Sequence, residues 1–271
     1  MAALHPVQVM GILNLTPDSF SDGGRHLAPA AALAQARALI AAGADVLDVG
    51  GESTRPGAAP VDEAEEISRV VPLIAAVRAE SHIAISVDTM KPAVARAAVA
   101  AGASIWNDVA ALGFAPEGPE VAAELGCQVV LMHMQGEPRT MQADPRYDDV
   151  VAEVCEFLVA RAEAAVAAGV ARERIWLDPG IGFGKRLEHN LALLARLDRV
   201  TALGFPVLLG ASRKSFIKAL DPAGAGPADR LGGSLAAALA GVAAGVAAVR
   251  VHDVAETVQA LRLWEAVSRA R

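Results

Sequence analysis

The sequence is poor in aromatic side chains and in basic charge. Its 271 residues include six Phe, three Trp and one Tyr, whereas hydrophobic residues make up 54% of the chain. The core must therefore be built mainly from Ala, Val, Leu and Ile, which suits packed helices and buried parallel strands. Few aromatic rings and a formal net charge of −7 offer neither stacking platforms nor an attractive field for a polyanion, so we expect no nucleic-acid partner.

Cysteine is also scarce. Cys127 and Cys155 form no CxxC motif and lack the Cys/His spacing of a metal site, so we interpret both as reduced, buried thiols. The first 15 residues contain no basic segment and no evident cleavage site, which is typical of a cytoplasmic protein.

One uncharged stretch, residues 231–249, reaches the length of a membrane span. Its composition argues against a span, because Ala and Gly dominate it and Gly245 divides it into a helical part and a short Val-rich part. We therefore predict a buried helix followed by a strand, and no membrane contact.

Short runs rich in Val, Ile and Leu alternate with longer helical patterns along the whole chain. The predicted strands are residues 7–13, 46–49, 84–87, 104–106, 128–132, 175–177, 207–209 and 246–251. The predicted helices are residues 30–42, 63–79, 92–101, 119–125, 149–168, 187–203, 232–244 and 254–269. Eight βα units without a composition break or a long linker predict a (β/α)8 TIM barrel that forms one domain over residues 1–271.

An open doubly wound sheet is the alternative architecture. Such a sheet usually carries a GxGxxG turn after its first strand, whereas residues 14–18 read Asn-Leu-Thr-Pro-Asp. The glycine-dense turn at 180–184 follows the sixth predicted strand and has a different spacing. Lys214 and Ser215 are not preceded by the glycine of a GxxxxGK[ST] loop, so the sequence contains no nucleotide-type phosphate loop.

Each predicted strand leads into polar or ionisable side chains. In a barrel, the carboxyl ends of all strands surround one mouth, where barrel enzymes carry out their chemistry. In chain order the strand ends carry Asn14; Asp48 and Glu52; Asp88; Asn107 and Asp108; His133; Asp178; Ser212, Arg213 and Lys214; and Arg250 and His252. Any one of these groups is as easily a cap or a loop-fixing residue, but polar groups at all eight ends indicate a site.

Many of these side chains fall into two chemical sets. Asp88, Asn107 and Asp178 are short acceptors and amides, suited to the polar edge of a flat heterocycle. The second set contains cations, which suit an anionic group or stacking on a flat ring. Its members are Arg55, Lys214, Arg250 and His252. We therefore expect a ligand that is polar and planar at one end and anionic at the other.

Two long predicted loops, residues 16–26 and 52–61, are rich in Gly, Ser, Pro and Asp. Loops of this composition and length often close over a bound substrate, and tolerated surface loops are the alternative. Arg55 favours a substrate cover, because it lies in the middle of its loop with Glu52 as its only nearby carboxylate in the sequence.

A series of motifs runs in order from residue 10 to residue 253 and coincides with the predicted strands. The segments are 10–24 (MGILNLTPDSFSDGG), 48–57 (DVGGESTRPG), 86–89 (SVDT), 107–108 (ND), 132–133 (MH), 178–185 (DPGIGFGK), 210–215 (GASRKS) and 250–253 (RVHD). Together they resemble the motif series of the dihydropteroate synthase family, with Ile181 as a tolerated apolar variant.

The resemblance implies a homodimeric (β/α)8 barrel that joins 6-hydroxymethyl-7,8-dihydropterin pyrophosphate to 4-aminobenzoate and releases pyrophosphate and 7,8-dihydropteroate. The residues that it places around the pterin are Asp88, Asn107, Asp178, Lys214 and Arg250, with Arg250 stacked on the ring. It assigns Asn14 to Mg²⁺, and the pyrophosphate contacts to Asn14, Arg55, Arg250 and His252. The implied aminobenzoate pocket consists of Thr54, Pro56, Phe183, Lys214 and Ser215. The implied catalytic set is Asn14, Asp22, Arg55, Lys214, Arg250 and His252.

The residue types suit that reaction. An aromatic amine is a weak nucleophile, so the barrier falls mainly when Mg²⁺ and Arg side chains neutralise the charge that develops on the leaving pyrophosphate. The resulting pterin-stabilised cation needs no strong general base, and the sequence shows no Ser/His/Asp or Cys/His triad pattern. We therefore interpret His133 as a structural residue or one that supports the site from behind.

Two other functions share the heterocycle-binding residues. A pterin-dependent methyltransferase barrel would pass a methyl group to a corrinoid partner, but it has no use for Arg55 or for residues 212–215. A non-catalytic pterin-binding paralogue would have lost its loop chemistry. The presence of Asn14, Asp22, Thr54 and Arg55 favours the synthase over that paralogue.

Overall fold

The computed structural model describes residues 7–15, 24–53, 58–137 and 139–270. Within these residues, eight parallel strands form one sheet in the order β6-β5-β4-β3-β2-β1-β8-β7. The strands are β1 (Gln8–Asn14), β2 (Val46–Gly50), β3 (Ala84–Asp88), β4 (Ile105–Asp108), β5 (Gln128–Met132), β6 (Ile175–Asp178), β7 (Leu208–Leu209) and β8 (Ala248–Val251). A bridge between Leu177 and Val207, with a 2.9 Å hydrogen bond from Leu177 N–H to the Pro206 carbonyl oxygen, closes the barrel between β6 and β7.

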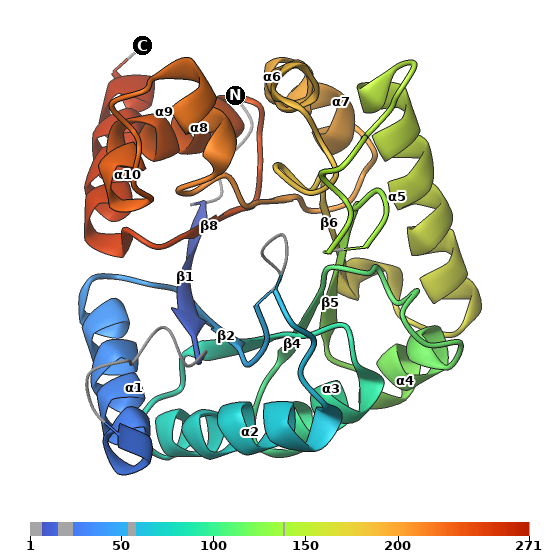
Figure 1. The fold of residues 1–271 in the computed structure, drawn as a ribbon, viewed down its shortest axis with the longest axis vertical. Helices are drawn as coiled ribbons and strands as arrows, with labels where there is room; N and C mark the ends of the chain where they lie inside the picture. Colours follow the sequence, from blue (N-terminus) through green and yellow to red (C-terminus); the bar gives the residue numbers. More distant parts are fainter. Residues whose placement is uncertain (1–6, 16–23, 54–57, 138, 271) are drawn as a thin grey trace.

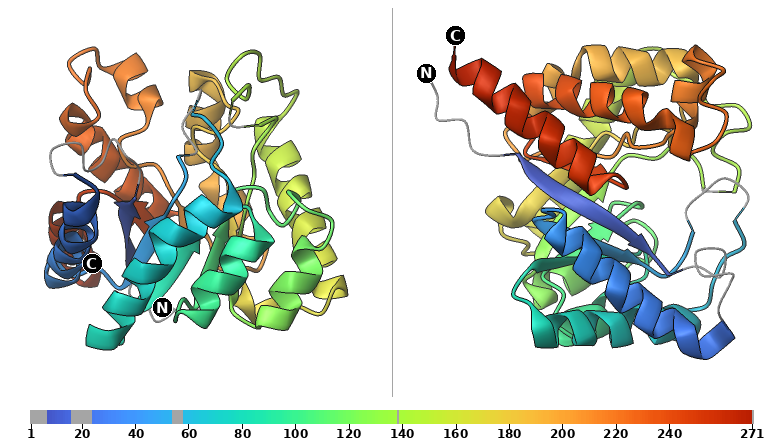
Figure 2. Two further views of the ribbon diagram at one scale, coloured as in Figure 1. Left: turned by 60° about the horizontal axis from the view of Figure 1, so that its bottom comes forward. Right: turned by 90° about the vertical axis from the view of Figure 1, so that its left-hand side faces the viewer.

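Helices surround the strands (Figure 1). They are α1 (Gly24–Ala41), α2 (Glu63–Glu80), α3 (Pro92–Ala100), α4 (Gly118–Leu125), α5 (Val150–Ala167), α6 (Leu187–Ala195), α7 (Leu197–Thr201), α8 (Ser215–Leu220), α9 (Leu231–Ala243) and α10 (Val254–Arg269), with short 3₁₀ turns at Arg172–Arg174 and Ala228–Arg230. The side view in Figure 2 shows β1 passing between α1 and α10, so the first and last βα units lie side by side. The predicted (β/α)8 barrel is confirmed.

The apolar core has two parts. Inside the barrel, six side chains from different strands pack together: Met10, Val46, Ile105, Val130, Leu208 and Ala248. A larger cluster between the strands and the helices consists mostly of Ala, Val, Leu and Ile, with Trp106 as its largest fully buried side chain. The indole N–H of Trp106 donates to the Thr89 carbonyl oxygen at 2.7 Å, so the one buried polar atom of this ring is satisfied.

The strand register brings the polar strand ends to one edge of the barrel. Asp88 lies opposite Gly50 on one side and Asn107 on the other. Further round the barrel, Asp178 lies opposite Met132. Parallel neighbours that pair near their carboxyl ends place the side chains of these residues around the same mouth.

The structure corrects several predicted element boundaries. The predicted helix 187–203 divides into α6 and α7, because Arg196 has φ −120° and ψ 32°, which is outside the helical range. Helix α8 was not predicted, since six residues are too few to show a 3.6-residue period. Helix α1 begins at Gly24, so the last three residues of the predicted loop 16–26 are helical. Asn107 and Asp108 lie within β4 rather than after it.

The uncharged stretch forms a helix and then a strand, as predicted. Helix α9 ends at Ala243, Gly245 takes a positive φ of +87°, and β8 begins at Ala248. None of the helices in the described ranges is both long and apolar enough to cross a membrane.

Candidate active site

Arg250 joins two carboxylates at the mouth of the barrel. Its Nε donates to Asp48 Oδ2 at 2.6 Å, and its Nη2 donates to Asp88 Oδ2 at 2.7 Å. Burial alone would lower the pKa of Arg250, but the two carboxylates raise it, so the guanidinium stays charged. Asp48 is fully buried and is absent from the predicted ligand set. Its position at a strand end is visible in the sequence, but its role of orienting Arg250 depends on a contact between residues 202 positions apart in the chain.

Asp88 has one satisfied and one unsatisfied oxygen. While Oδ2 accepts from Arg250, Oδ1 is buried and accepts no hydrogen bond from any residue that the structure describes. Burial raises the pKa of Asp88 despite the neighbouring Arg250. An unsatisfied buried acceptor is costly, so Oδ1 is suited to accept a hydrogen bond from an N–H of a bound ligand.

Asn107 and Asp178 complete the predicted heterocycle-binding set. Both side chains are buried. Asn107 Nδ2 lies 3.4 Å from each oxygen of Asp48. Asp178 Oδ1 accepts from the Gly180 N–H at 2.7 Å, and burial raises the pKa of this carboxyl although Lys214, Arg250 and Lys185 act in the opposite direction. The mouth therefore combines buried acceptors with an amide, as expected for the polar edge of a heterocycle.

Lys214 and Phe183 lie together at the rim. The ammonium nitrogen of Lys214 is 3.9 Å from the centroid of the Phe183 ring, which is cation–π geometry. Gly182 passes underneath with φ +82°, and a Cβ built there would lie 3.0 Å from Lys214 Cδ. Ser215 begins α8 directly after Lys214 and is exposed. The structure thus brings Phe183 and Lys214 together, and Ser215 is next to Lys214 in the chain.

His252 differs from the cation that its place in the sequence predicted. Burial, with Arg250 and Arg213 nearby, lowers its pKa from 6.5 to about 3, so the imidazole is neutral at pH 7. Ser212 Oγ accepts from the His252 backbone N–H at 3.2 Å and lies 3.1 Å from His252 Nδ1. The hydroxyl can donate to Nδ1, and in that tautomer the proton lies on Nε2. His252 is suited to donate one hydrogen bond to an anion rather than to supply a charge.

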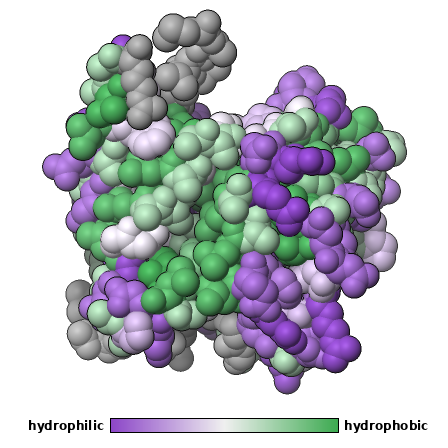
Figure 3. Space-filling view, turned by 90° about the horizontal axis from the view of Figure 1, so that it is seen from above, coloured by the Kyte–Doolittle hydropathy of each residue, from purple (hydrophilic) through white to green (hydrophobic). Residues whose placement is uncertain are grey.

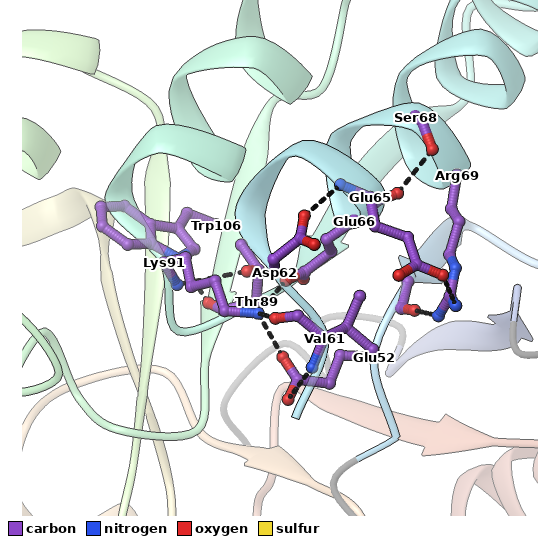
Figure 4. A network of polar contacts seen from close by, with 11 residues as sticks. Glu52, Val61, Asp62, Glu65, Glu66, Ser68, Arg69, Thr89, Lys91 and Trp106 are labelled. Carbon is purple, nitrogen blue, oxygen red and sulfur yellow. Dashed lines mark hydrogen bonds and ion pairs between the residues drawn. The ribbon is translucent and has the colours of Figure 1, made fainter. Parts of the chain in front are cut away.

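A buried lysine, Lys91, binds residues of the connection between β2 and α2 and a residue of α2 itself. The ammonium of Lys91 donates to Glu52 Oε2 at 2.5 Å, to the Val61 carbonyl oxygen at 2.7 Å and to Glu66 Oε2 at 2.6 Å (Figure 4). The backbone N–H of Val61 donates to Glu52 Oε1 at 3.3 Å. Glu52, the local carboxylate suggested for Arg55, thus binds Lys91. Sequence reasoning missed Lys91 and Glu66, because their partners are 25 or more residues apart.

Some predicted site residues lie outside the described residues: Asp22, Thr54, Arg55 and Pro56. Asn14 is described at the end of β1 and is half-buried. A Cβ built at Gly50 would lie 3.4 Å from Asn14 Oδ1 and 3.8 Å from Asp88 Oδ2, so these two oxygens flank Gly50. In the part of the chain that the structure describes, no group of three or more His, Cys, Asp or Glu side chains forms a candidate metal cluster.

Comparison with known proteins defines the class. The sequence profile of the pterin binding enzyme family matches residues 10–252, which includes every strand-end residue described above. Dihydropteroate synthase of Escherichia coli strain K12 is 51% identical over 267 residues, which cover 98% of this chain and 93% of the relative.

Solved structures give the same result. Xanthomonas albilineans dihydropteroate synthase with 4-aminobenzoic acid has a TM-score of 0.92 and 51% identity, covering 98% of this chain and 94% of that one. The same organism's enzyme in complex with 7,8-dihydropteroate has a TM-score of 0.89 and 48% identity, with 98% and 95% coverage. This chain belongs to the dihydropteroate synthase family of pterin-binding enzymes.

Proposed function

We propose that this protein condenses 6-hydroxymethyl-7,8-dihydropterin pyrophosphate with 4-aminobenzoate, and that it releases pyrophosphate and 7,8-dihydropteroate in folate biosynthesis. The observation that carries the proposal is the buried polar set of Asp88, Asn107 and Asp178 at one end of the barrel. The family supports it, because relatives of about 50% identity over nearly the whole chain bear the name dihydropteroate synthase.

The pterin edge would bind to this buried set. A pterin presents ring N–H and amino groups along one edge, and the free oxygen of Asp88 and the second oxygen of Asp178 are acceptors for them. Asn107 can both donate and accept. Lys214 completes the set at the rim, while Arg250 is held by Asp48 and Asp88 where its planar guanidinium can stack on the ring.

The reaction breaks one bond and forms another at the exocyclic methylene carbon. The C–O bond to pyrophosphate breaks, and its electron pair leaves with the pyrophosphate. The amine nitrogen of 4-aminobenzoate then donates its lone pair to the carbon and afterwards loses a proton to solvent. Arg250 and the Nε2–H of His252 would contact the departing phosphate oxygens, and Arg55 is proposed for the same role on the strength of the family motif.

The residues present fit a magnesium ion. Asn14 Oδ1, which lies next to Gly50 at the end of β1, is a hard ligand, and Mg²⁺ at a phosphate site needs only one or two protein ligands beside phosphate oxygens and water. We propose Asn14 as the protein ligand. When bound, the ion would neutralise charge on the leaving pyrophosphate.

The aminobenzoate pocket would lie at the rim, where Phe183 offers an apolar ring and Lys214 a positive charge for the carboxylate. Ser215 is next to Lys214, and Thr54 and Pro56 are assigned to the same pocket by the family motif. Asp22, in the first predicted loop, is proposed as a member of the catalytic set on the strength of the family motif. A methyltransferase reaction receives no support from relatives that are named synthases.

We also propose a homodimer. Figure 3 looks down on the top of the molecule as drawn in Figure 1, and this face carries a continuous apolar area. The helices at the top of Figure 1 include α6, α8 and α9. Helix α9 contains no charged residue, and its exposed side chains include Ala236 and Ala240. Leu191 on α6 and Leu220 on α8 are 38% and 57% exposed. Such an area on a folded protein marks an interaction surface. Light scattering should return twice the mass of one chain.

The domain organisation and the compartment are proposals as well. Strand β1 pairs with both β2 and β8, so the two halves of the chain share one closed sheet, and a single unfolding transition would support one domain over residues 1–271. Both cysteines are free; Cys127 is buried, whereas Cys155 is half-buried rather than buried as expected. Free thiols suit the reducing cytoplasm.

The test of the proposed activity is product formation. Incubation with both substrates and Mg²⁺ should yield 7,8-dihydropteroate, detected by mass spectrometry, and omission of the pterin pyrophosphate should abolish it. A protein that binds the pterin but yields no product would instead be the non-catalytic paralogue.

A further inference from the structure

Lys185 is a buried lysine outside the proposed ligand set. Its ammonium donates to the Phe183 carbonyl oxygen at 3.0 Å and to the His133 carbonyl oxygen at 3.3 Å, and lies 2.9 Å from His133 Nδ1. No carboxylate among the described residues forms an ion pair with it. Burial lowers its pKa to about 7, and His133 is neutral because burial lowers its pKa to about 3. In its charged form Lys185 donates to His133 Nδ1 as well, so that all three donors of the ammonium are used.

The turn at residues 180–184, which Lys185 binds through the Phe183 carbonyl oxygen, has little intrinsic preference for one conformation. Gly180, Gly182 and Gly184 all have positive φ, at +67°, +82° and +58°, and glycine adopts such angles freely but loses the most conformational entropy when it is fixed. Close packing requires glycine as well, since a Cβ at Gly180 would lie 1.9 Å from the His133 carbonyl oxygen. This turn therefore needs contacts from elsewhere to hold its shape.

Side chains from outside the turn bind three successive carbonyl groups. Gln142 Nε2 donates to Gly182 O at 2.7 Å, Lys185 donates to Phe183 O, and the Tyr147 hydroxyl donates to Gly184 O at 2.7 Å. Gln142 and Tyr147 belong to the connection between β5 and α5. Phe183, whose carbonyl lies in the middle of the three, is the residue whose ring contacts Lys214.

We propose that Lys185, Tyr147 and Gln142 are positioning residues that fix Phe183 for the amine substrate, so that Lys185 and the β5–α5 connection control capture of 4-aminobenzoate without touching it. The inference rests on the proposed function. Loss of one of these hydrogen bonds should leave the buried pterin set in place. Asp88, Asn107 and Arg250 lie on other strands, and Asp178 precedes the turn and is held by the pairing of β6 with β5. It should weaken aminobenzoate binding selectively.

Tyr147→Phe is the main test variant, because it removes one hydroxyl and keeps the ring. We expect the KM for 4-aminobenzoate to rise about fivefold, as for one lost hydrogen bond, with kcat and the Kd of the pterin pyrophosphate within twofold of wild type. Lys185→Met should raise this KM further, but it also removes a charge that acts on Asp178, so Tyr147→Phe carries the test of selectivity. Arg146→Ala is the matched control, because Arg146 lies in the same connection but its side chain binds exposed Asp144.

Hydrogen exchange separates the structural step from the catalytic one. Amides of residues 180–186 should exchange faster in Tyr147→Phe than in wild type and in the Arg146→Ala control, with no substrate present. Faster exchange with an unchanged KM for 4-aminobenzoate would overturn the proposal, and so would an equal weakening of pterin binding. If Tyr147→Phe exchanges faster than wild type at residues 180–186 but the wild-type protein forms no dihydropteroate, the proposed function fails instead.

Discussion

Arg250 Nη2 and Asp88 Oδ2 lie 2.7 Å apart across the mouth of the barrel, although 162 residues separate them in the sequence. The contact sets the plane of a guanidinium next to a carboxyl whose second oxygen is unsatisfied. The arrangement presents a flat cation and a free acceptor side by side. A planar heterocycle with N–H groups on one edge can use both at once, which no single residue of the pair could provide.

Asp178→Asn should weaken pterin binding by about 100-fold or more, because a buried mispaired polar group costs several kcal/mol. The amide oxygen can still accept from the Gly180 N–H, so the turn should persist, but the NH₂ group would face the N–H groups of the pterin. Isothermal titration calorimetry with the pterin pyrophosphate measures the change. Unchanged affinity in a variant with wild-type circular dichroism would remove Asp178 from the site.

Arg250→Lys should remain defective, although it conserves the charge. One ammonium has neither the plane that stacks on a ring nor the spacing with which Arg250 reaches both Asp48 and Asp88. We expect pterin pyrophosphate affinity to fall about tenfold or more. The matched control is Arg37→Lys, whose guanidinium pairs with exposed Glu80 on the outer surface. Wild-type affinity in Arg250→Lys would show that charge alone is required.

Lys91→Met should lower the free energy of unfolding by about 3–5 kcal/mol, because it leaves Glu66 and Glu52 without their buried cation. Urea unfolding followed by circular dichroism measures this loss. The double variant Lys91→Met with Glu66→Leu should recover part of the stability, since it removes the most buried of the two carboxylates. A loss below about 1 kcal/mol in the single variant would contradict the importance of this network.

His133 should contribute a pH-dependent stability. Burial lowers its pKa from 6.5 to about 3, so between these values the unfolded chain binds a proton that the folded chain does not. The contribution is present above pH 6.5 and is lost as the pH falls, by up to about 1.4 kcal/mol per pH unit. In urea unfolding at several pH values, the stability of wild type relative to His133→Gln should fall between pH 6.5 and 4. Exposed His82 provides the control variant His82→Gln, and a difference that does not vary with pH would refute the assignment.

The barrel could be predicted from the sequence because each βα unit is a local pattern. Strand runs such as 128–132 and helical patterns such as 63–79 report a period and a length, and neither depends on distant residues. The break at Arg196 could not be predicted, because the apolar spacing continues through it. Helix α8 is too short to show a period.

The candidate site divides in the same way. The polar strand ends, including Asp88 and Asp178, could be located because strand order and register follow from the fold. The contacts of Lys91 with Glu66 and of Asp48 with Arg250 could not, since they depend on which side chains meet in three dimensions. The neutral state of His252 is likewise a consequence of burial, which its position beside Arg250 in the motif does not reveal.

Pyrophosphate release by the wild-type protein tests the central claim most directly. With 6-hydroxymethyl-7,8-dihydropterin pyrophosphate, 4-aminobenzoate and Mg²⁺, the protein should release one pyrophosphate for each 7,8-dihydropteroate formed, and Asp178→Asn should reduce the rate at low pterin concentration. Release should slow strongly when Mg²⁺ is chelated. No pyrophosphate release by folded wild-type protein that binds the pterin pyrophosphate would contradict the synthase assignment.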